Sequence, residues 1–276
     1  MTLIDFVEST ASGLISGAVV VFFGVKSLRD YLEARGLKRA VDTLGRFWRA
    51  PGRYAIVFGV QDRSDRLSFS PRVGYAQAFG VSEITRAIEQ VNPRADIRLM
   101  PVKTGAAIPR QAFEDNIILI GGELVLPAIR SVSLALTVPF YQHDMGETPR
   151  CISRFDTRGH VTDKLFSTQG QEPGVLLSDI GTICRIVNPL NKRLIILFNA
   201  NHSAGLLGAM LFTCRPEEMA RLELSPTSNG LQVVVEVANL ENNLIGRDHP
   251  VSRVRSSDFQ VDASDAVNAV NSAVHG

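Results

Sequence analysis

The sequence predicts a three-layer α/β domain that follows one membrane-spanning helix. After residue 53, short apolar runs alternate with helical segments, which is the order of a mainly parallel sheet covered by helices. Near the N-terminus, residues 9–25 carry no charged side chain. The 276 residues include 29 Lys and Arg against 28 Asp and Glu, so the chain lacks the basic excess of a nucleic-acid-binding surface. We therefore expect no direct nucleic-acid partner.

The uncharged stretch STASGLISGAVVVFFGV, residues 9–25, predicts a transmembrane helix. A hydrocarbon core of about 30 Å is crossed by roughly 17–25 apolar residues. A secretory signal peptide and a buried core helix are the alternatives, but residues 1–8 lack a basic region and core helices are usually shorter. Because Lys and Arg cluster after the span, the protein is expected to cross the inner (plasma) membrane once, with residues 1–8 outside and the main domain in the cytoplasm.

Residues 26–52 predict a basic, amphipathic juxtamembrane helix. Its apolar stripe consists of Leu28, Tyr31, Leu32, Leu37, Val41, Leu44 and Trp48. Such a helix can lie on an anionic leaflet, and it can equally pack on the domain or on a second copy of the chain. Gly13 and Gly17 in the span permit close helix–helix approach, so a homo-oligomer is expected beside the lipid bilayer as a partner. Ala50-Pro51-Gly52 ends this helix.

Residues 53–255 are predicted to form the α/β domain. Apolar runs of strand type occur at 54–60, 97–102, 116–120, 193–199 and 231–238, and helical segments occur at 71–91, 127–135, 203–214 and 216–222. The mixed composition of 138–187 predicts a small β-hairpin insertion or an antiparallel edge of the sheet. Residues 256–276 are predicted to form a polar tail that is helix-prone or disordered.

Polar and small residues follow several of the predicted strands, and ligands of open α/β sheets bind outside the carboxyl ends of the strands. Consecutive glycines let backbone N–H groups approach a phosphate or a ribose, although they also suit a tight turn. A histidine at a strand–helix junction can act as a general base or bind a ligand, although Ser203 beside it also suits a helix cap. The candidate ligand-binding residues at these ends are Gly59, Arg63, Gly121, Gly122, Asn201, His202 and Gly205.

Residues 178–189 add three further candidates. Asp179 and Arg185 are six positions apart, so on an extended strand their side chains face the same side. The carboxylate can bind a ribose hydroxyl and the guanidinium a phosphate, or the two can form a structural ion pair. Asn188 follows them in the same polar stretch and is included among the ligand-binding candidates.

These motifs together resemble a loose group of bacterial Rossmann-like domains, described as TIR-like, SLOG-like and deoxyribosyltransferase-like. The resemblance rests on NIILIGG at 116–122, on SDIGTICRIVNP at 178–189 and on NHSAG at 201–205. It implies a Rossmann-like sheet that binds or cleaves a nucleotide, in some members fused to a membrane span in prokaryotic signalling and antiphage (antiviral) defence. The positions that it indicates are Gly121, Gly122, Asp179, Gly181, Arg185, Asn188, Pro189, Asn201, His202 and Gly205.

An enzyme of this group needs a catalytic carboxylate, for which Glu123 and Glu83 are the candidates, with His202 assisting. Neither glutamate lies in a matching motif, which favours a membrane-anchored sensor or effector that binds a nucleotide-like ligand. The alternatives are a nucleotide- or NAD-directed glycosyl hydrolase or transferase and a non-catalytic membrane scaffold. No G-x-G-x-x-G, P-loop or metal-binding pattern occurs, so no metal and no further cofactor are expected. The three cysteines fit reduced thiols in the cytoplasm.

Overall fold

Seven strands form one mixed sheet in the order β10-β9-β7-β8-β3-β1-β2. The computed structural model describes residues 33, 35–60, 74–122, 126–142, 151–156, 160–169, 176–222, 228–238, 240 and 245–275. The chain divides into two compact units, residues 1–43 and 44–276, and the sheet belongs to the second. The sequence prediction of an α/β fold is confirmed at this level, and the mixed sheet with its helices is consistent with a Rossmann-like architecture.

Four neighbouring strands of the sheet run parallel to one another. They are β1 (Tyr54–Val60), β2 (Ile97–Lys103), β3 (Asn116–Ile120) and β8 (Leu194–Ala200). Every residue of β1, β3 and β8 is buried, because helices cover both faces of the sheet and continuous apolar runs suit such strands. The carboxyl ends of these strands form one edge, which we call the carboxyl edge.

Three antiparallel strands extend the sheet beyond β8. Strand β7 (Ser178–Val187) pairs with β8 and with β9 (Gly230–Ala238), and β10 (Val251–Phe259) forms the outer edge. Between Arg253 and Arg255 the register of β10 shifts at a bulge. Because β7 runs against β8, the amino-terminal end of β7 lies at the carboxyl edge.

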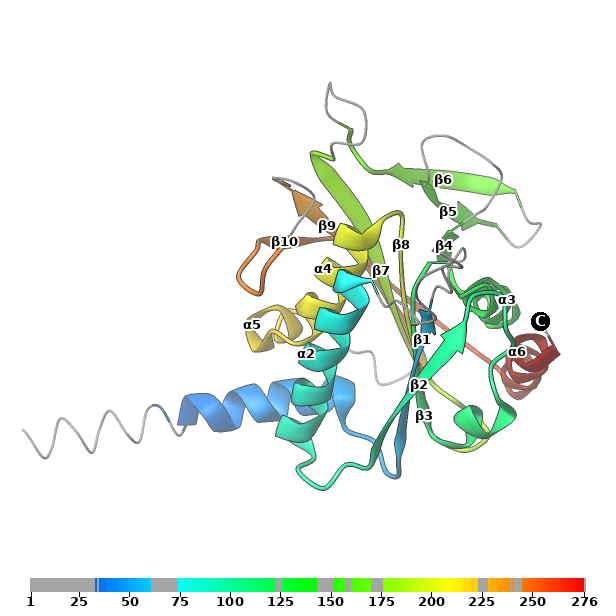
Figure 1. Ribbon diagram of the computed structural model, residues 1–276, viewed down its shortest axis with the longest axis horizontal. Helices are drawn as coiled ribbons and strands as arrows, with labels where there is room; N and C mark the ends of the chain where they lie inside the picture. Colours follow the sequence, from blue (N-terminus) through cyan, green and yellow to red (C-terminus); the bar gives the residue numbers. More distant parts are fainter. Residues whose placement is uncertain are drawn as a thin grey trace, which may run out of the picture. The chain divides into compact units, whose positions relative to one another are not determined.

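Helices cover both faces of the sheet (Figure 1). Helix α2 (Tyr75–Val91), helix α4 (Ser203–Thr213) and the short α5 (Pro216–Met219) lie on one face. Helix α3 (Ala128–Ala135), helix α6 (Ala263–His275) and the 3-10 helix η1 (Arg110–Glu114) lie on the other. Helix α4 is buried at every position after its first, which explains why its sequence shows no polar face.

A separate three-stranded sheet packs beside α3. It consists of β4 (Phe140–Gln142), β5 (Cys151–Phe155) and β6 (Val161–Phe166), and it rests on β7 and β9 through Phe140, Ile152, Ile180 and Val234. The side-chain amide of Gln232 donates to the Phe140 carbonyl and accepts from the Phe140 N–H, at 2.5 and 2.8 Å. This sheet corresponds to the predicted β insertion.

Two boundaries of the predicted domain differ from the structure. Residues 178–187 were expected within the insertion or at an antiparallel edge, yet they form β7, near the centre of the main sheet. Its Asp, Gly and Thr interrupt the apolar pattern because they contact α4 and β8, as described below. The predicted tail from 256 onward completes β10 and then forms α6, whose Ala266, Ala269 and Ala273 are buried.

Residues 35–48 are helical, as the predicted juxtamembrane helix requires. Only part of the expected apolar stripe is buried: Leu37 is 64% exposed, whereas Leu44 and Trp48 are 1% and 0% exposed. The predicted span, residues 9–25, lies outside the described residues. Within the part of the chain that the structure describes, no helix is both long enough and apolar enough to cross a membrane.

Helix α4 packs directly on β7 through two glycines. A Cβ added at Gly181 would lie 2.2 Å from the Gly205 carbonyl oxygen, and one added at Gly205 would lie 2.5 Å from the Ile180 carbonyl oxygen. Such distances leave no room for a methyl group, and the obstructing atoms belong to the backbone, which cannot turn aside. Glycine at both positions is therefore what allows the helix to reach the strand.

We expect the substitution Gly181→Ala to lower the free energy of unfolding by about 3 kcal/mol or more, because overpacking forces helix and strand apart. Gly246→Ala is the matched control, since a Cβ there would meet nothing within 4 Å, and it should change stability by less than about 1 kcal/mol. Urea unfolding followed by circular dichroism measures both. Equal stability of the two variants would contradict the direct packing.

Candidate functional site

At the carboxyl edge, one residue from each of four neighbouring strands lies in a single row across the sheet. Pairing aligns Phe58 with Ile120 and Ile120 with Phe198, so that Gly59, Gly121 and Asn199 occupy the next position of their strands. Asn199 pairs in turn with Thr182 of β7. Since side chains alternate between faces, this row lies on the α3 face of the sheet, one step beyond the buried Val57, Leu119, Leu197 and Cys184. Two residues of the row, Gly59 and Gly121, have no side chain of their own, and Gly121 is the neighbour of Asn199 across the β3–β8 pair.

Gly121 has a backbone conformation that L-residues with side chains rarely adopt, with φ at 147°. Its N–H donates to the Phe198 carbonyl at 3.1 Å, and the Gly122 carbonyl accepts from the Leu126 N–H at 2.9 Å. Gly121 therefore continues the pairing of β3 with β8 by one residue and then turns the chain. The Gly121 N–H is already used within the sheet, so it does not contribute to phosphate binding as the sequence suggested.

A buried carboxylate, Asp179 at the start of β7, organises the neighbouring part of the edge. Asp179 is 0% exposed. Its Oδ1 accepts from the Ser167 hydroxyl at 2.6 Å and from the Ile180 N–H at 2.9 Å, and its Oδ2 accepts from the Gly205 N–H. Gly205 lies in the first turn of α4, where the helix leaves its N–H groups unpaired and favours negative charge. Asp179 thus caps α4 from the adjacent strand.

His202 and Asn201 lie between Asp179 and the small sheet. The His202 Nδ1 atom is 3.3 Å from Asp179 Oδ1, and the His202 side chain remains 28% exposed. The Asn201 Nδ2 group donates to the Ser167 hydroxyl at 3.1 Å and to the Leu165 carbonyl at 3.3 Å. The carboxylate therefore orients the imidazole and, through Ser167, the amide.

Three polar side-chain atoms in this region have no hydrogen-bond partner among the described residues. They are the Nδ2 donor of Asn199, the Oδ1 acceptor of Asn201 and the hydroxyl of Ser178, and the three residues are only 3%, 1% and 6% exposed. An unpaired buried polar group costs about 1–3 kcal/mol, and most such groups in proteins find a partner. A buried amide donor and a buried amide acceptor, two residues apart at the end of β8, define the candidate binding site.

Arg185 and Asn188, predicted as ligand-binding residues, belong to the opposite edge of the sheet. Asp179 and Arg185 do share a face of β7, but six residues of strand separate them by about 20 Å. The Arg185 Nε donates to the Phe47 carbonyl at 2.9 Å and its guanidinium lies over the Phe47 ring. Asn188 accepts from the Leu190 N–H and turns the chain into β8. Both residues have structural roles, and neither forms an ion pair with Asp179.

The candidate catalytic carboxylate Glu83 is engaged elsewhere. Its two oxygens accept from the Arg247 guanidinium at 2.5 and 3.0 Å, and Arg86 lies 3.5 Å away. Glu83 acts electrostatically on Cys214, at the end of α4 opposite to His202. The 11 residues of α4 span about 16 Å, so Glu83 and His202 do not form one site. The candidates Arg63 and Glu123 lie outside the described residues.

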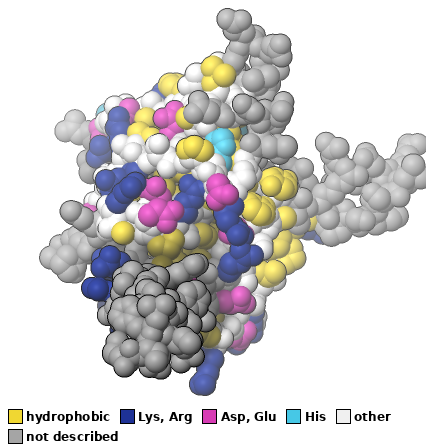
Figure 2. Space-filling view, turned by 90° about the vertical axis from the view of Figure 1, so that its left-hand side faces the viewer, with side chains coloured by type: hydrophobic (Ala, Val, Ile, Leu, Met, Phe, Trp, Pro, Cys, Tyr) yellow, Lys and Arg dark blue, Asp and Glu magenta, His cyan; other side chains and the backbone are white. Residues whose placement is uncertain are grey.

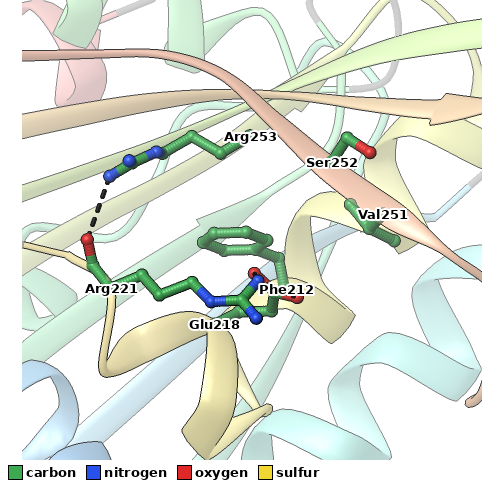
Figure 3. Close-up of a pocket in the computed structure, with 6 residues that line it drawn as sticks. All are labelled: Phe212, Glu218, Arg221, Val251, Ser252 and Arg253. Atoms are coloured by element: carbon green, nitrogen blue, oxygen red, sulfur yellow. Dashed lines mark hydrogen bonds and ion pairs between the residues drawn. The ribbon is translucent and has the colours of Figure 1, made fainter.

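A surface pocket of about 340 Å³ lies between α5 and β10 (Figure 3), away from the predicted residues. Arg221, Arg253, Glu218 and Phe212 contribute to its wall. Arg221 already pairs with Glu218 at 3.3 Å, and Arg253 donates to the Arg221 carbonyl at 3.1 Å. Acidic and basic side chains are intermixed on this side of the molecule (Figure 2), so it presents no surface of one sign.

Buried thiols supply no nucleophile to the site. Burial raises the pKa of the Cys214 thiol to about 12 and raises that of Cys184 as well, so both stay protonated at neutral pH. None of the three cysteines forms a disulfide. Within the described ranges, no group of three or more His, Cys, Asp or Glu side chains is arranged to hold a metal ion.

Comparisons of the chain with protein-family models, with curated proteins and with solved structures found no match in any of the three. What the structure itself defines is a mixed α/β domain whose carboxyl edge carries polar side chains, some of them without a hydrogen-bond partner among the described residues.

Sequence analysis identified Gly59, Gly121, Asn201, His202 and Gly205 at this edge, and the structure brings all five to it. It did not single out Asn199, Ser167 or Thr182 as site residues. Asn199 had a usable signal, because it is the polar residue that ends the apolar run RLIILF. Ser167 and Thr182 had none, since each reaches the edge only through the pairing of distant strands.

We expect Asp179→Asn to lower the free energy of unfolding by about 3 kcal/mol or more, because the amide loses charge-assisted bonds and opposes an NH₂ group to backbone donors. Ser167→Ala is the control: it removes one of the donors and should cost about 1 kcal/mol. Both values come from urea unfolding of the purified chain. An Asp179→Asn variant as stable as the wild type would show that this carboxylate does not hold α4 in place.

Proposed function

We propose that the protein is a membrane-anchored sensor or effector whose α/β domain binds a nucleotide-like ligand at the carboxyl edge, with a role in prokaryotic signalling or defence. One observation carries the binding proposal: the Asn199 donor and the Asn201 acceptor are buried without a partner among the described residues, and Gly121 lies beside Asn199 in the row. Ligands of open α/β sheets bind at this edge. Side-chain amides pair well with nucleobase edges, which also present adjacent donors and acceptors.

The arrangement around α4 determines which part of a nucleotide the edge can recognise. A phosphate at the amino terminus of α4 would compete with the Asp179 carboxylate, which already accepts from the Gly205 N–H. Among the described residues, Asp179 is contacted by the Ser167 hydroxyl, by the backbone N–H groups of Ile180 and Gly205 and by the His202 imidazole, so both of its oxygens are engaged within the protein and are not free to bind a ribose hydroxyl. We therefore assign recognition to the base, through Asn199 and Asn201, with the exposed His202 imidazole beside it.

The alternative of a glycosyl hydrolase or transferase receives less support from the geometry. Its candidate Glu83 is paired with Arg247 and Arg86, and its candidate Glu123 lies outside the described residues. The pairing of His202 with Asp179 orients an imidazole for proton transfer, but it also serves a binding site. A sensor or effector requires only the binding groups.

We expect nucleotides to raise the unfolding temperature of the full chain in mild detergent. The probes are adenosine 5′-monophosphate, the other three ribonucleoside monophosphates, NAD⁺ and a cyclic dinucleotide. At 100 times the dissociation constant a ligand contributes about 2.7 kcal/mol, which for a domain of this size corresponds to roughly 5–10 °C. Differential scanning fluorimetry measures the shift. If none of these nucleotides shifts the transition at millimolar concentration, the proposal is wrong.

Asn199→Leu separates binding from folding. Leucine has the same branched shape as asparagine, with slightly larger end groups, and it removes the unpaired donor. That gain offsets part of the cost of the Ala200 N–H, which loses its bond to Asn199 Oδ1, so the ligand-free variant should lose no more than about 2–3 kcal/mol and stay folded. The nucleotide-induced shift should disappear. Asn271→Ala, at an exposed position of α6, is the control and should retain the full shift. A large shift that persists in Asn199→Leu would place the ligand elsewhere.

The membrane anchor is tested separately. Because residues 9–25 are uncharged and long enough to span a bilayer, we expect the full chain to stay in the membrane pellet during alkaline carbonate extraction. Replacing Val20 and Phe22 by Asp should release it, since charged residues are costly at the centre of a bilayer. Recovery of the unaltered chain in the supernatant would exclude an integral anchor.

A further inference from the structure

Both elements that carry the candidate site also contact Trp48, which ends the helix of residues 35–48. Helix α4 starts after His202 and ends at Thr213, whose carbonyl accepts from the Trp48 Nε1–H at 2.9 Å. Strand β8 carries Asn199, and the preceding residue, Phe198, stacks on Trp48 with ring centroids 6.3 Å apart. The Trp48 indole thus contacts the C-terminal end of α4 and Phe198, the residue that precedes Asn199.

Trp48 is held from its other side by the start of the sheet. Its carbonyl accepts from the Tyr54 hydroxyl at 2.6 Å, and burial raises the pKa of that phenol, which keeps the proton available. Arg185 donates to the carbonyl of the neighbouring Phe47. The last turn of the helix is therefore fixed by Tyr54 of β1 and Arg185 of β7, in addition to the contacts with α4 and β8.

Helix α4 is suited to transmit a displacement between its two ends. Gly205 and Gly181 place it directly against the backbone of β7. Gly208 of α4 lies against the Val237 side chain of β9, and Gly80 of α2 lies against the Met210 side chain of α4. Packed interfaces of this kind do not deform continuously but shift between discrete arrangements. A change at Gly205, which Asp179 contacts, would in that case be carried along the helix to Thr213.

We propose that nucleotide binding at the carboxyl edge is coupled through α4 and β8 to the contacts that fix Trp48. It is thereby coupled to the helix that Trp48 ends, which follows the predicted membrane segment in the sequence. The inference rests on the proposed nucleotide site and assigns its regulation. Binding groups at one end of α4 and β8 and an aromatic anchor at the other form one continuous path of contacts.

Thermodynamic linkage makes the coupling measurable from either end. If nucleotide binding tightens the hold on Trp48, weakening that hold must reduce nucleotide affinity by the same factor. Trp48→Phe keeps an aromatic ring but removes the bond to the Thr213 carbonyl. It leaves every residue of the candidate site unchanged. The bond that it removes lies at the C-terminal end of α4, about 16 Å along the helix from His202, whereas the ring that it keeps can still contact Phe198, next to Asn199.

Trp48 is the only tryptophan of the chain, so intrinsic fluorescence reports on it alone. We expect adenosine 5′-monophosphate to change the Trp48 emission of the full-length protein with the same dissociation constant as the thermal shift. Trp48→Phe should weaken binding of this nucleotide about 5-fold or more, as measured by calorimetry. Phe113→Leu, a core change in η1 that does not touch α4, is the control for general destabilisation and should leave the affinity unchanged.

The outcomes separate the coupling from the binding proposal. One outcome is that nucleotide binding depends on Asn199, but that neither the Trp48 emission nor the affinity of the Trp48→Phe variant changes. This outcome would overturn the coupling and leave the proposed binding site intact. If no nucleotide binds, the proposed function fails, and the coupling is then decided by Asn199→Leu alone. A shift of Trp48 emission in that ligand-free variant supports the path, and an emission identical to the wild type overturns it.

Discussion

The direct contact between α4 and β7 determines where the other parts of the domain can lie. Two glycines remove the side chains that would separate helix and strand, and the Asp179 carboxylate then caps the helix from within the contact. The capping carboxylate also fixes Ser167, which in turn orients Asn201. The small sheet, the strand ends and the helix thus meet at one buried carboxylate. Hydrogen-bond donors from three segments of the chain offset the free-energy cost of burying it.

This contact explains both the successes and the errors of sequence analysis. Strands such as YAIVFGV and NIILI are recognisable because burial on both faces demands continuous apolar residues. Strand β7 was expected in the insertion or at an antiparallel edge and not near the centre of the sheet, because Asp179, Gly181 and Thr182 break its apolar pattern where they contact α4 and β8. Residues that meet such tertiary requirements contradict the local pattern, so a local rule misplaces them.

The candidate site shows the same division between local and long-range information. Gly121 and His202 were identified because they follow apolar runs, a signal contained within a few residues. Arg185 was misassigned because alternation along a strand predicts the face of a side chain but not its partner, which here is a carbonyl 138 positions away in sequence. The roles of Ser167 and Glu83 depended equally on pairings that no short segment encodes.

The two outer strands of the sheet limit how the domain can associate with others. Strand β10 carries a bulge between Arg253 and Arg255, and β2 contains Pro101, which has no N–H to offer a neighbouring strand. Charges, bulges and prolines at sheet edges prevent an additional strand from pairing there. Both outer strands therefore disfavour growth of the sheet by strand addition, which leaves side-chain surfaces as the easier route by which a second copy of the chain could associate with this domain.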